Sequence, residues 1–141
     1  MAQNDFIFVD TSGWIAVLNR DDEYHDLALE LVQEFKTTQN GLVTTDWVLA
    51  ETGNGLARTA ARESFLNSVS SLFQSAKSRL IWIQEEILEE SMTLYAKVDD
   101  KKWGIVDCAS IVVMQHENIM DVLTADRHFQ QAGFHCLLPT P

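Results

Sequence analysis

Four acidic residues stand at comparable places in the sequence, although they are far apart along the chain. Asp10 and Asp126 each follow a short apolar run in which a buried strand is expected. Glu51 and Asp107 each lie in the first turns of an expected helix and interrupt its apolar face. An isolated ionised carboxylate is costly to bury, so something must compensate these charges in the folded chain.

A hard divalent cation with oxygen ligands is the compensation that best fits a group of carboxylates. Bound ions of this kind lower the pKa of a bound water, orient it for attack on a phosphodiester and neutralise the leaving oxygen. We therefore predict that Asp10, Glu51, Asp107 and Asp126 are both the metal ligands and the catalytic residues, with Mg²⁺ or Mn²⁺ as cofactor. Whether one or two ions bind is left open.

Other polar residues near the four acids are candidates for orienting carboxylates or waters. Asp107 gains support if Gly104 is the N-cap of its helix, because the helix dipole then favours the ionised acid. The four histidines lack the spacing of a zinc site, and only His128, two residues after Asp126, merits a test. The candidate orienting residues are Thr11, Ser12, Asn54, Ser110 and Thr124.

The elements that must position these residues alternate between strands and helices. This alternation predicts an α/β fold with three layers and a central parallel sheet of four to five strands. Reactive groups should then collect outside the carboxyl ends of the strands. Strands are expected at 6–9, 42–44, 80–83, 121–123 and 136–138, and helices at 12–19, 27–35, 47–58, 65–73, 87–98, 105–116 and 127–132, with Asp46 as a candidate N-cap and Asn40 and Gly41 ending the second helix.

Length and composition predict one domain spanning residues 1–141, since the chain is 46% hydrophobic and contains no Pro- or Gly-rich linker. No apolar stretch is long enough to cross a membrane and no signal peptide is visible, so a cytoplasmic protein is expected. Cys108 and Cys136 are expected to be buried free thiols.

The chain carries ten Lys and Arg against 21 Asp and Glu, a formal charge of −11. This charge argues against a generic RNA-binding module, because such modules attract phosphates through basic patches. It does not argue against an enzyme that contacts phosphate through bound cations, since the ions invert the local field. A basic protein partner would also suit such a surface.

Six motifs follow one another along the chain: VDTS at 9–12, DEYHDLA at 22–28, LAE at 49–51, WGIVDCAS at 103–110, LTADRHF at 123–129 and GF at 133–134. Taken in this order, they resemble the PIN-domain ribonucleases, and especially the VapC-like toxins of type II toxin–antitoxin pairs. The resemblance implies a compact α/β/α endoribonuclease that cuts single-stranded regions of RNA with Mg²⁺ or Mn²⁺. It also implies a cognate antitoxin that places a basic side chain in the acidic site, and a homodimer. Gly104 departs from the family, which commonly has Ser there.

Two other functions also place acidic residues after strands or keep this fold. An aspartyl-phosphate phosphatase also places an acid after the first strand, but it needs a second Asp two residues later, where this chain has Ser12. A catalytically inactive module that binds only RNA or protein remains the alternative, although the presence of all four acids favours an enzyme. The RNA target and the identity of the antitoxin do not follow from the sequence.

Overall fold

The chain folds around a five-stranded sheet in which every neighbouring pair of strands is parallel. The computed structural model describes residues 6–38 and 41–140. Across the sheet the strands follow the order β3-β2-β1-β4-β5, which confirms the expected parallel sheet. The strands are β1 (Phe6–Val9), β2 (Gly41–Thr45), β3 (Arg79–Ile81), β4 (Asp121–Leu123) and β5 (His135–Cys136).

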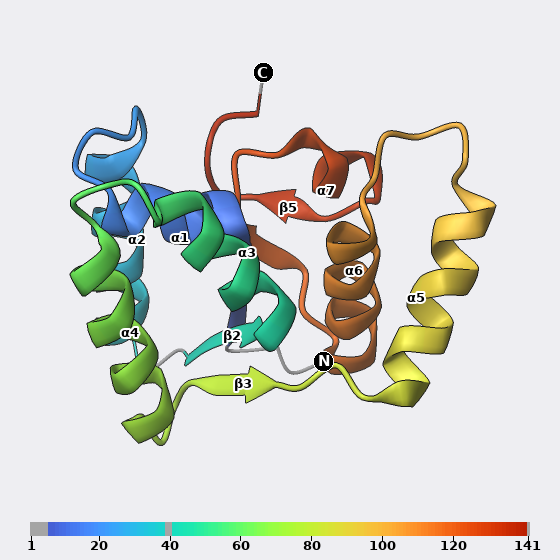
Figure 1. Cartoon of the computed structure of the whole chain (residues 1–141), viewed down its shortest axis with the longest axis horizontal. Coiled ribbons are helices and arrows are strands. Elements are labelled where there is room, and N and C mark those ends of the chain that lie inside the picture. The colour runs from blue at the N-terminus through green and yellow to red at the C-terminus, as the bar shows by residue number, and fades with distance from the viewer. Residues whose placement is uncertain (1–5, 39–40, 141) are drawn as a thin grey trace.

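Helices cover both faces of this sheet. Crossovers between parallel strands are right-handed, so the strand order places α1 to α4 on one face and α5 to α7 on the other. In Figure 1, α2 and α4 lie to the left of the strands and α5 and α6 to the right, which is the three-layer arrangement expected from the sequence. The helices are α1 (Thr11–Leu18), α2 (His25–Thr37), α3 (Asp46–Leu56), α4 (Arg62–Gln74), α5 (Glu85–Lys97), α6 (Ile105–Glu117) and α7 (Arg127–Gln131).

The core lies where the central strand β1 meets the long buried run of helix α6. Ile7, Phe8 and Val9 of β1 are buried, because helices cover this strand on both sides and leave no face for water. All residues from 108 to 114 of α6 are buried as well. Both cysteines are free thiols as predicted; Cys108 is buried, but Cys136 is only partly buried, contrary to expectation.

Some predicted element ends are wrong by a few residues, and one predicted cap is wrong. The N-cap of α3 is Thr45, whose hydroxyl accepts a hydrogen bond from the Val48 backbone N–H at 3.1 Å. Asp46 instead begins the helix, and its Oδ1 accepts from the Ile83 backbone N–H at 2.8 Å. Helix α2 ends at Thr37, and Gly41 begins β2; the predicted stop at Asn40 lies outside the described residues.

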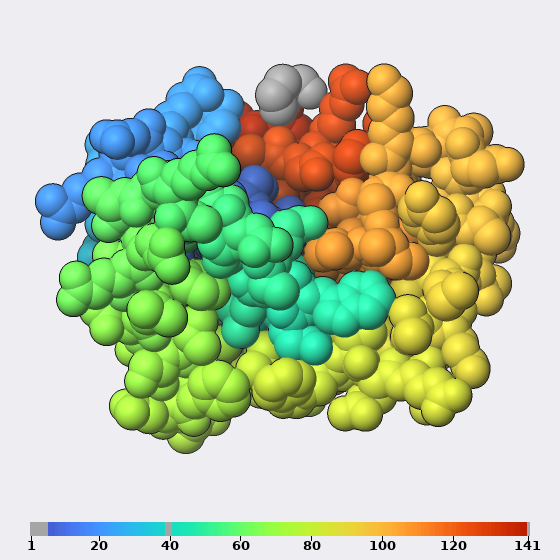
Figure 2. Space-filling view, viewed as in Figure 1, coloured from blue at the N-terminus to red at the C-terminus, as the bar shows by residue number. Residues whose placement is uncertain are grey.

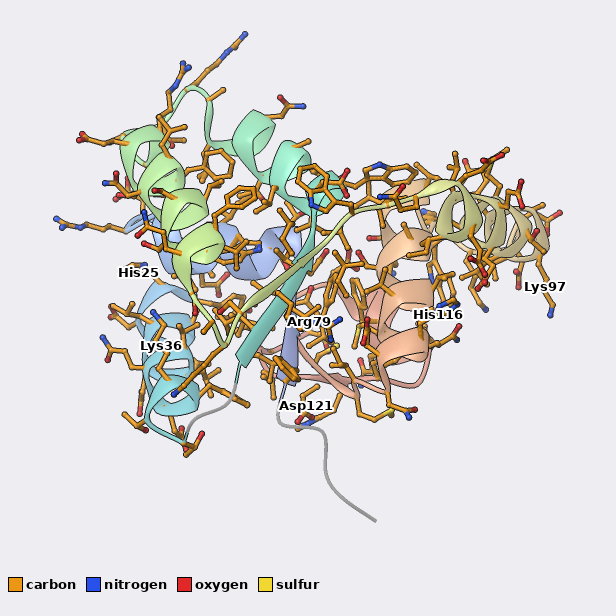
Figure 3. All side chains as sticks on the ribbon, turned by 90° about the horizontal axis from the view of Figure 1, so that it is seen from below. His25, Lys36, Arg79, Lys97, His116 and Asp121 are labelled. Carbon is orange, nitrogen blue, oxygen red and sulfur yellow. The ribbon has the colours of Figure 1, made fainter. Side chains whose placement is uncertain are left out.

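The carboxyl ends of the five strands lie together at one end of the sheet. Figure 3 shows Asp121, the first residue of β4, toward the lower end of the strands, so the carboxyl ends face upward in that view. At this end α1 packs directly on β4, because a Cβ added to Gly13 would lie 2.0 Å from the Leu123 backbone oxygen. Among the described helices, none combines the length and apolar character needed to cross a membrane.

Candidate metal centre

Two neighbouring strands deliver two of the predicted acids to the same edge. Val9 of β1 is in register with Leu123 of β4, so Asp10 and the segment leading to Asp126 leave the sheet side by side. The two other acids come from the start of α6 and from α3. Figure 2 shows dark blue atoms of the first elements recessed between the turquoise atoms of α3, the orange atoms of α6 and the red C-terminal segment.

Asp10 lies at the floor of this site and is only 3% exposed. Its Oδ2 accepts a hydrogen bond from the Thr124 hydroxyl at 3.0 Å, whereas its Oδ1 is buried with no hydrogen-bond partner among the described residues. The pKa of Asp10 is raised to about 7, chiefly by burial and also by the charges of Asp107 and Asp126, against the opposing hydrogen bonds of the Thr11 backbone and the Thr124 hydroxyl. The ionised carboxylate therefore lacks a compensating charge.

Asp107 lies in the first turn of α6, and Gly104 is the N-cap of that helix, as predicted. The Gly104 backbone N–H donates to Asp107 Oδ2 at 3.0 Å. Burial is the main cause that raises the pKa of Asp107, and the nearby charge of Asp126 acts in the same direction. The helix N-terminus and the hydrogen bond hold the side chain in place but do not offset its loss of water.

Asp126 is the N-cap of α7, and its Oδ1 accepts from the His128 backbone N–H at 2.9 Å. An N-cap role is the ordinary explanation for an acid at this position. The same side chain nevertheless lies beside two other aspartates, so capping and participation in the acidic site coincide in one residue.

His128 is the residue that the structure adds to the predicted group. Its Nδ1 lies 3.0 Å from Asp107 Oδ2 and 3.1 Å from Asp126 Oδ1. One potential ligand atom from each of these three residues lies within 4.8 Å of the other two. The only signal in the sequence was its position two residues after Asp126, which places it in the first turn of α7.

Glu51 is the acid whose surroundings differ most from expectation. Its side chain is exposed, so the predicted burial of this charge is wrong. The Thr11 hydroxyl donates a hydrogen bond to Glu51 Oε1, which links α3 to the residue that follows Asp10. The three aspartates thus interact directly, whereas Glu51 joins them through a neighbouring hydroxyl.

The hydroxyl groups at the strand ends form a connected network. Thr124 Oγ1 lies 2.8 Å from Ser12 Oγ and accepts from the Asp126 backbone N–H at 3.0 Å. The Ser12 hydroxyl also accepts from the Ala125 backbone N–H at 3.0 Å. Ser110 Oγ is buried without a partner in the described part of the chain. Asn54 is exposed, and none of its hydrogen bonds within that part reaches the four acids.

The donor set suits a hard divalent cation. Only one carboxylate oxygen of each aspartate is identified as a hydrogen-bond acceptor among residues 6–38 and 41–140. This oxygen is Oδ2 in Asp10 and Asp107, and Oδ1 in Asp126. The second oxygen of each side chain remains for a ligand. The buried, unpartnered Oδ1 of Asp10 is the observation that most favours a cation at this place, because a buried polar atom without a partner destabilises the fold.

Comparison with known proteins finds relatives of the whole chain. The curated relative 23S rRNA-specific endonuclease VapC20 of Mycobacterium tuberculosis is 27% identical over 128 residues, which cover 91% of this chain and 95% of the relative. The crystal structure of VapC20, described as a Sarcin-Ricin loop cleaving toxin, matches with a TM-score of 0.79 and 26% identity over 91% of this chain and 95% of that chain.

Two more distant structures share the fold. VapBC2 from Rickettsia felis, bound to a DNA fragment from its promoter, matches with a TM-score of 0.61 and 16% identity over 90% of this chain and 92% of that chain. FitAcB from Neisseria gonorrhoeae matches with a TM-score of 0.65 and 17% identity over 94% of this chain and 97% of that chain. The PIN domain family matches residues 7–135, so the chain belongs to the PIN domain family.

Proposed function

We propose that this protein is an endoribonuclease that hydrolyses RNA phosphodiester bonds with Mg²⁺ or Mn²⁺, and that it is the toxin of a toxin–antitoxin pair. The observation that carries the proposal is Asp10, a buried carboxylate with one unpartnered oxygen and a pKa raised to about 7 beside Asp107 and Asp126. Membership in the PIN domain family and the similarity to the endonuclease VapC20 support the same activity.

Asp10, Asp107 and Asp126 would hold the ion, and Glu51 would complete the acidic site from α3. A bound divalent cation lowers the pKa of a coordinated water and neutralises charge on the leaving oxygen. The chain's own contribution is to fix the carboxylates in place. The Thr124 hydroxyl fixes Asp10, and backbone N–H groups at the starts of α6 and α7 fix the other two aspartates.

The proposed substrate is ribosomal RNA of the 23S class. This proposal rests on the similarity to VapC20, which is described as specific for 23S rRNA and as cleaving the Sarcin-Ricin loop. The match extends over 91% of this chain and 95% of that relative.

The proposed partner is a small antitoxin protein with a basic side chain that enters the acidic site. The net charge of −11 favours a cationic partner, and the folds of VapBC2 and FitAcB resemble this chain. A homodimer is proposed from the family resemblance alone.

Brief expression in bacterial cells, followed by mapping of new RNA ends, tests this function. The wild type should arrest growth and create new ends in ribosomal RNA, whereas Asp107→Asn should do neither. Growth arrest by both forms without new RNA ends would instead support the alternative, a catalytically inactive binding module.

A further inference from the structure

The His128 side chain lies between two of the proposed metal ligands, Asp107 and Asp126. Its side chain is 23% exposed and extends from α7 toward the start of α6. Nδ1 makes a hydrogen bond of 3.0 Å to Asp107 Oδ2 and lies 3.1 Å from Asp126 Oδ1. The ring nitrogen therefore lies between carboxylates at the starts of two successive helices, α6 and α7.

The chemistry of these contacts defines the direction of the hydrogen bond. An ionised carboxylate can only accept, so Nδ1 must carry the proton that lies between the two aspartates. Both the neutral ring with its proton on Nδ1 and the doubly protonated ring supply this N–H. The contact thus does not depend on the charge of the ring.

The oxygens that face His128 are the ones already held by the backbone. Asp107 Oδ2 also accepts from the Gly104 N–H, and Asp126 Oδ1 also accepts from the backbone N–H of His128 itself. Asp107 is thus held through one oxygen by two N–H donors, whereas Asp126 is held by one backbone N–H, with the His128 ring nitrogen 3.1 Å from the same oxygen. The other oxygen of each carboxylate accepts no hydrogen bond from the described residues and is available to a cation.

We propose that His128 is a positioning residue of the metal centre, which holds Asp107 and Asp126 in their binding orientation through Nδ1–H and does not itself bind the ion. This inference rests on the proposed function and deepens it. Two neighbouring carboxylates repel each other, and a shared N–H donor reduces the free energy needed to keep them together before an ion binds.

Asparagine and leucine at position 128 separate this role from simple packing, because the two side chains have nearly the same shape. The amide nitrogen of Asn reaches the place of Nδ1 and keeps an N–H donor there, whereas Leu has none. We expect His128→Leu to raise the dissociation constant for Mn²⁺, measured by titration of the purified protein without RNA, by about tenfold or more. His128→Asn should stay within about threefold of the wild type.

His135→Leu is the matched control, because His135 lies in β5 beside Asp121, at the opposite end of the strands. It should leave Mn²⁺ binding unchanged. Circular dichroism establishes that each variant is folded, and His128→Ala replaces the Leu variant if leucine at this position prevents folding.

Electron paramagnetic resonance of bound Mn²⁺ distinguishes a positioning residue from a direct ligand, because a coordinating nitrogen couples to the electron spin of the ion. The proposal predicts no nitrogen coupled directly to the ion in the wild type. Strong nitrogen coupling that disappears in His128→Asn, or Mn²⁺ binding by His128→Leu that equals or exceeds the wild type, would overturn the proposal while leaving the nuclease function intact. If the wild type binds no Mn²⁺ at all, the proposed metal-dependent function fails and this role fails with it.

Discussion

At the scale of single residues, ionisation of the buried Asp10 carboxyl group lowers the stability of the folded chain. Asp10 has a pKa of about 7 in the folded chain against 3.8 for a free side chain, chiefly because burial removes it from water. The folded state therefore binds the proton more tightly than the unfolded chain does. Stability must fall as the pH rises from about 4 to about 7, because ionisation is opposed only in the folded state.

Asp10→Asn should remove this penalty. In chelator at a pH of about 8, we expect the free energy of unfolding of the variant to exceed that of the wild type by up to about 4 kcal/mol, from the difference in pKa. The advantage should shrink as the pH falls toward about 4 and vanish at lower pH, where Asp10 is protonated in both states. Urea titrations across this pH range measure it, and a constant difference at every pH would contradict the assignment.

Thr124 joins the ends of β1 and β4 through its hydroxyl, which contacts Asp10, Ser12 and the Asp126 backbone. Thr124→Val keeps the shape but removes these contacts. We expect the free energy of unfolding to fall by about 1 to 3 kcal/mol, and the rate of RNA cleavage to fall by about 10- to 100-fold. Thr93→Val, at an exposed hydroxyl of α5, serves as control and should change neither quantity appreciably.

At the scale of elements, the packing of α1 on β4 fixes the floor of the site. A Cβ at Gly13 would lie 2.0 Å from the Leu123 backbone oxygen, and backbone atoms cannot move aside without shifting the strand. Gly13→Ala should therefore destabilise the chain by about 1 to 3 kcal/mol or more and weaken Mn²⁺ binding.

Gly104→Ala provides the comparison for Gly13→Ala, because a Cβ at Gly104 meets no atom closer than 3.8 Å. Its expected cost is below about 1 kcal/mol, since only the cap changes. Thermal melts and Mn²⁺ titrations of both variants measure the two effects. Equal stability of the two variants would show that α1 does not need the close contact with β4.

The order of elements could be predicted from the sequence, because parallel strands between helices bring residues that follow the strands to one edge. That rule placed Asp10 and Asp126 together without any knowledge of side-chain contacts. The exposure of Glu51 and the approach of His128 to Asp107 depend on how α3 and α7 are rotated against their neighbours. This rotation is set by tertiary packing, which local sequence patterns do not describe.

Helix caps show the same limit. Asp46 and Thr45 are adjacent, and both residue types are good caps. Thr45 caps α3 because the Asp46 side chain is occupied by the Ile83 backbone N–H beyond β3. Only the arrangement of the strands decides between the two residues.

At the scale of the whole molecule, the net charge of −11 opposes the approach of RNA. Added monovalent salt screens this repulsion, whereas it weakens binding to a basic protein. At saturating Mn²⁺, we expect the KM for RNA to fall or to stay within about twofold as NaCl rises from about 50 to about 200 mM. A steep rise in KM would indicate that direct cationic contacts, rather than bound metal ions, attract the substrate.

The proposed metal-dependent function of the three aspartates is tested most directly by cleavage of RNA with purified protein. The wild type should cut 23S ribosomal RNA with Mg²⁺ or Mn²⁺ and stop in excess chelator. Glu89→Gln, an acid of α5 outside the site, should cut like the wild type, while Asp107→Asn should be slower by at least about a hundredfold. Cleavage by Asp107→Asn at the rate of the wild type, or cleavage unaffected by chelator, would contradict the account.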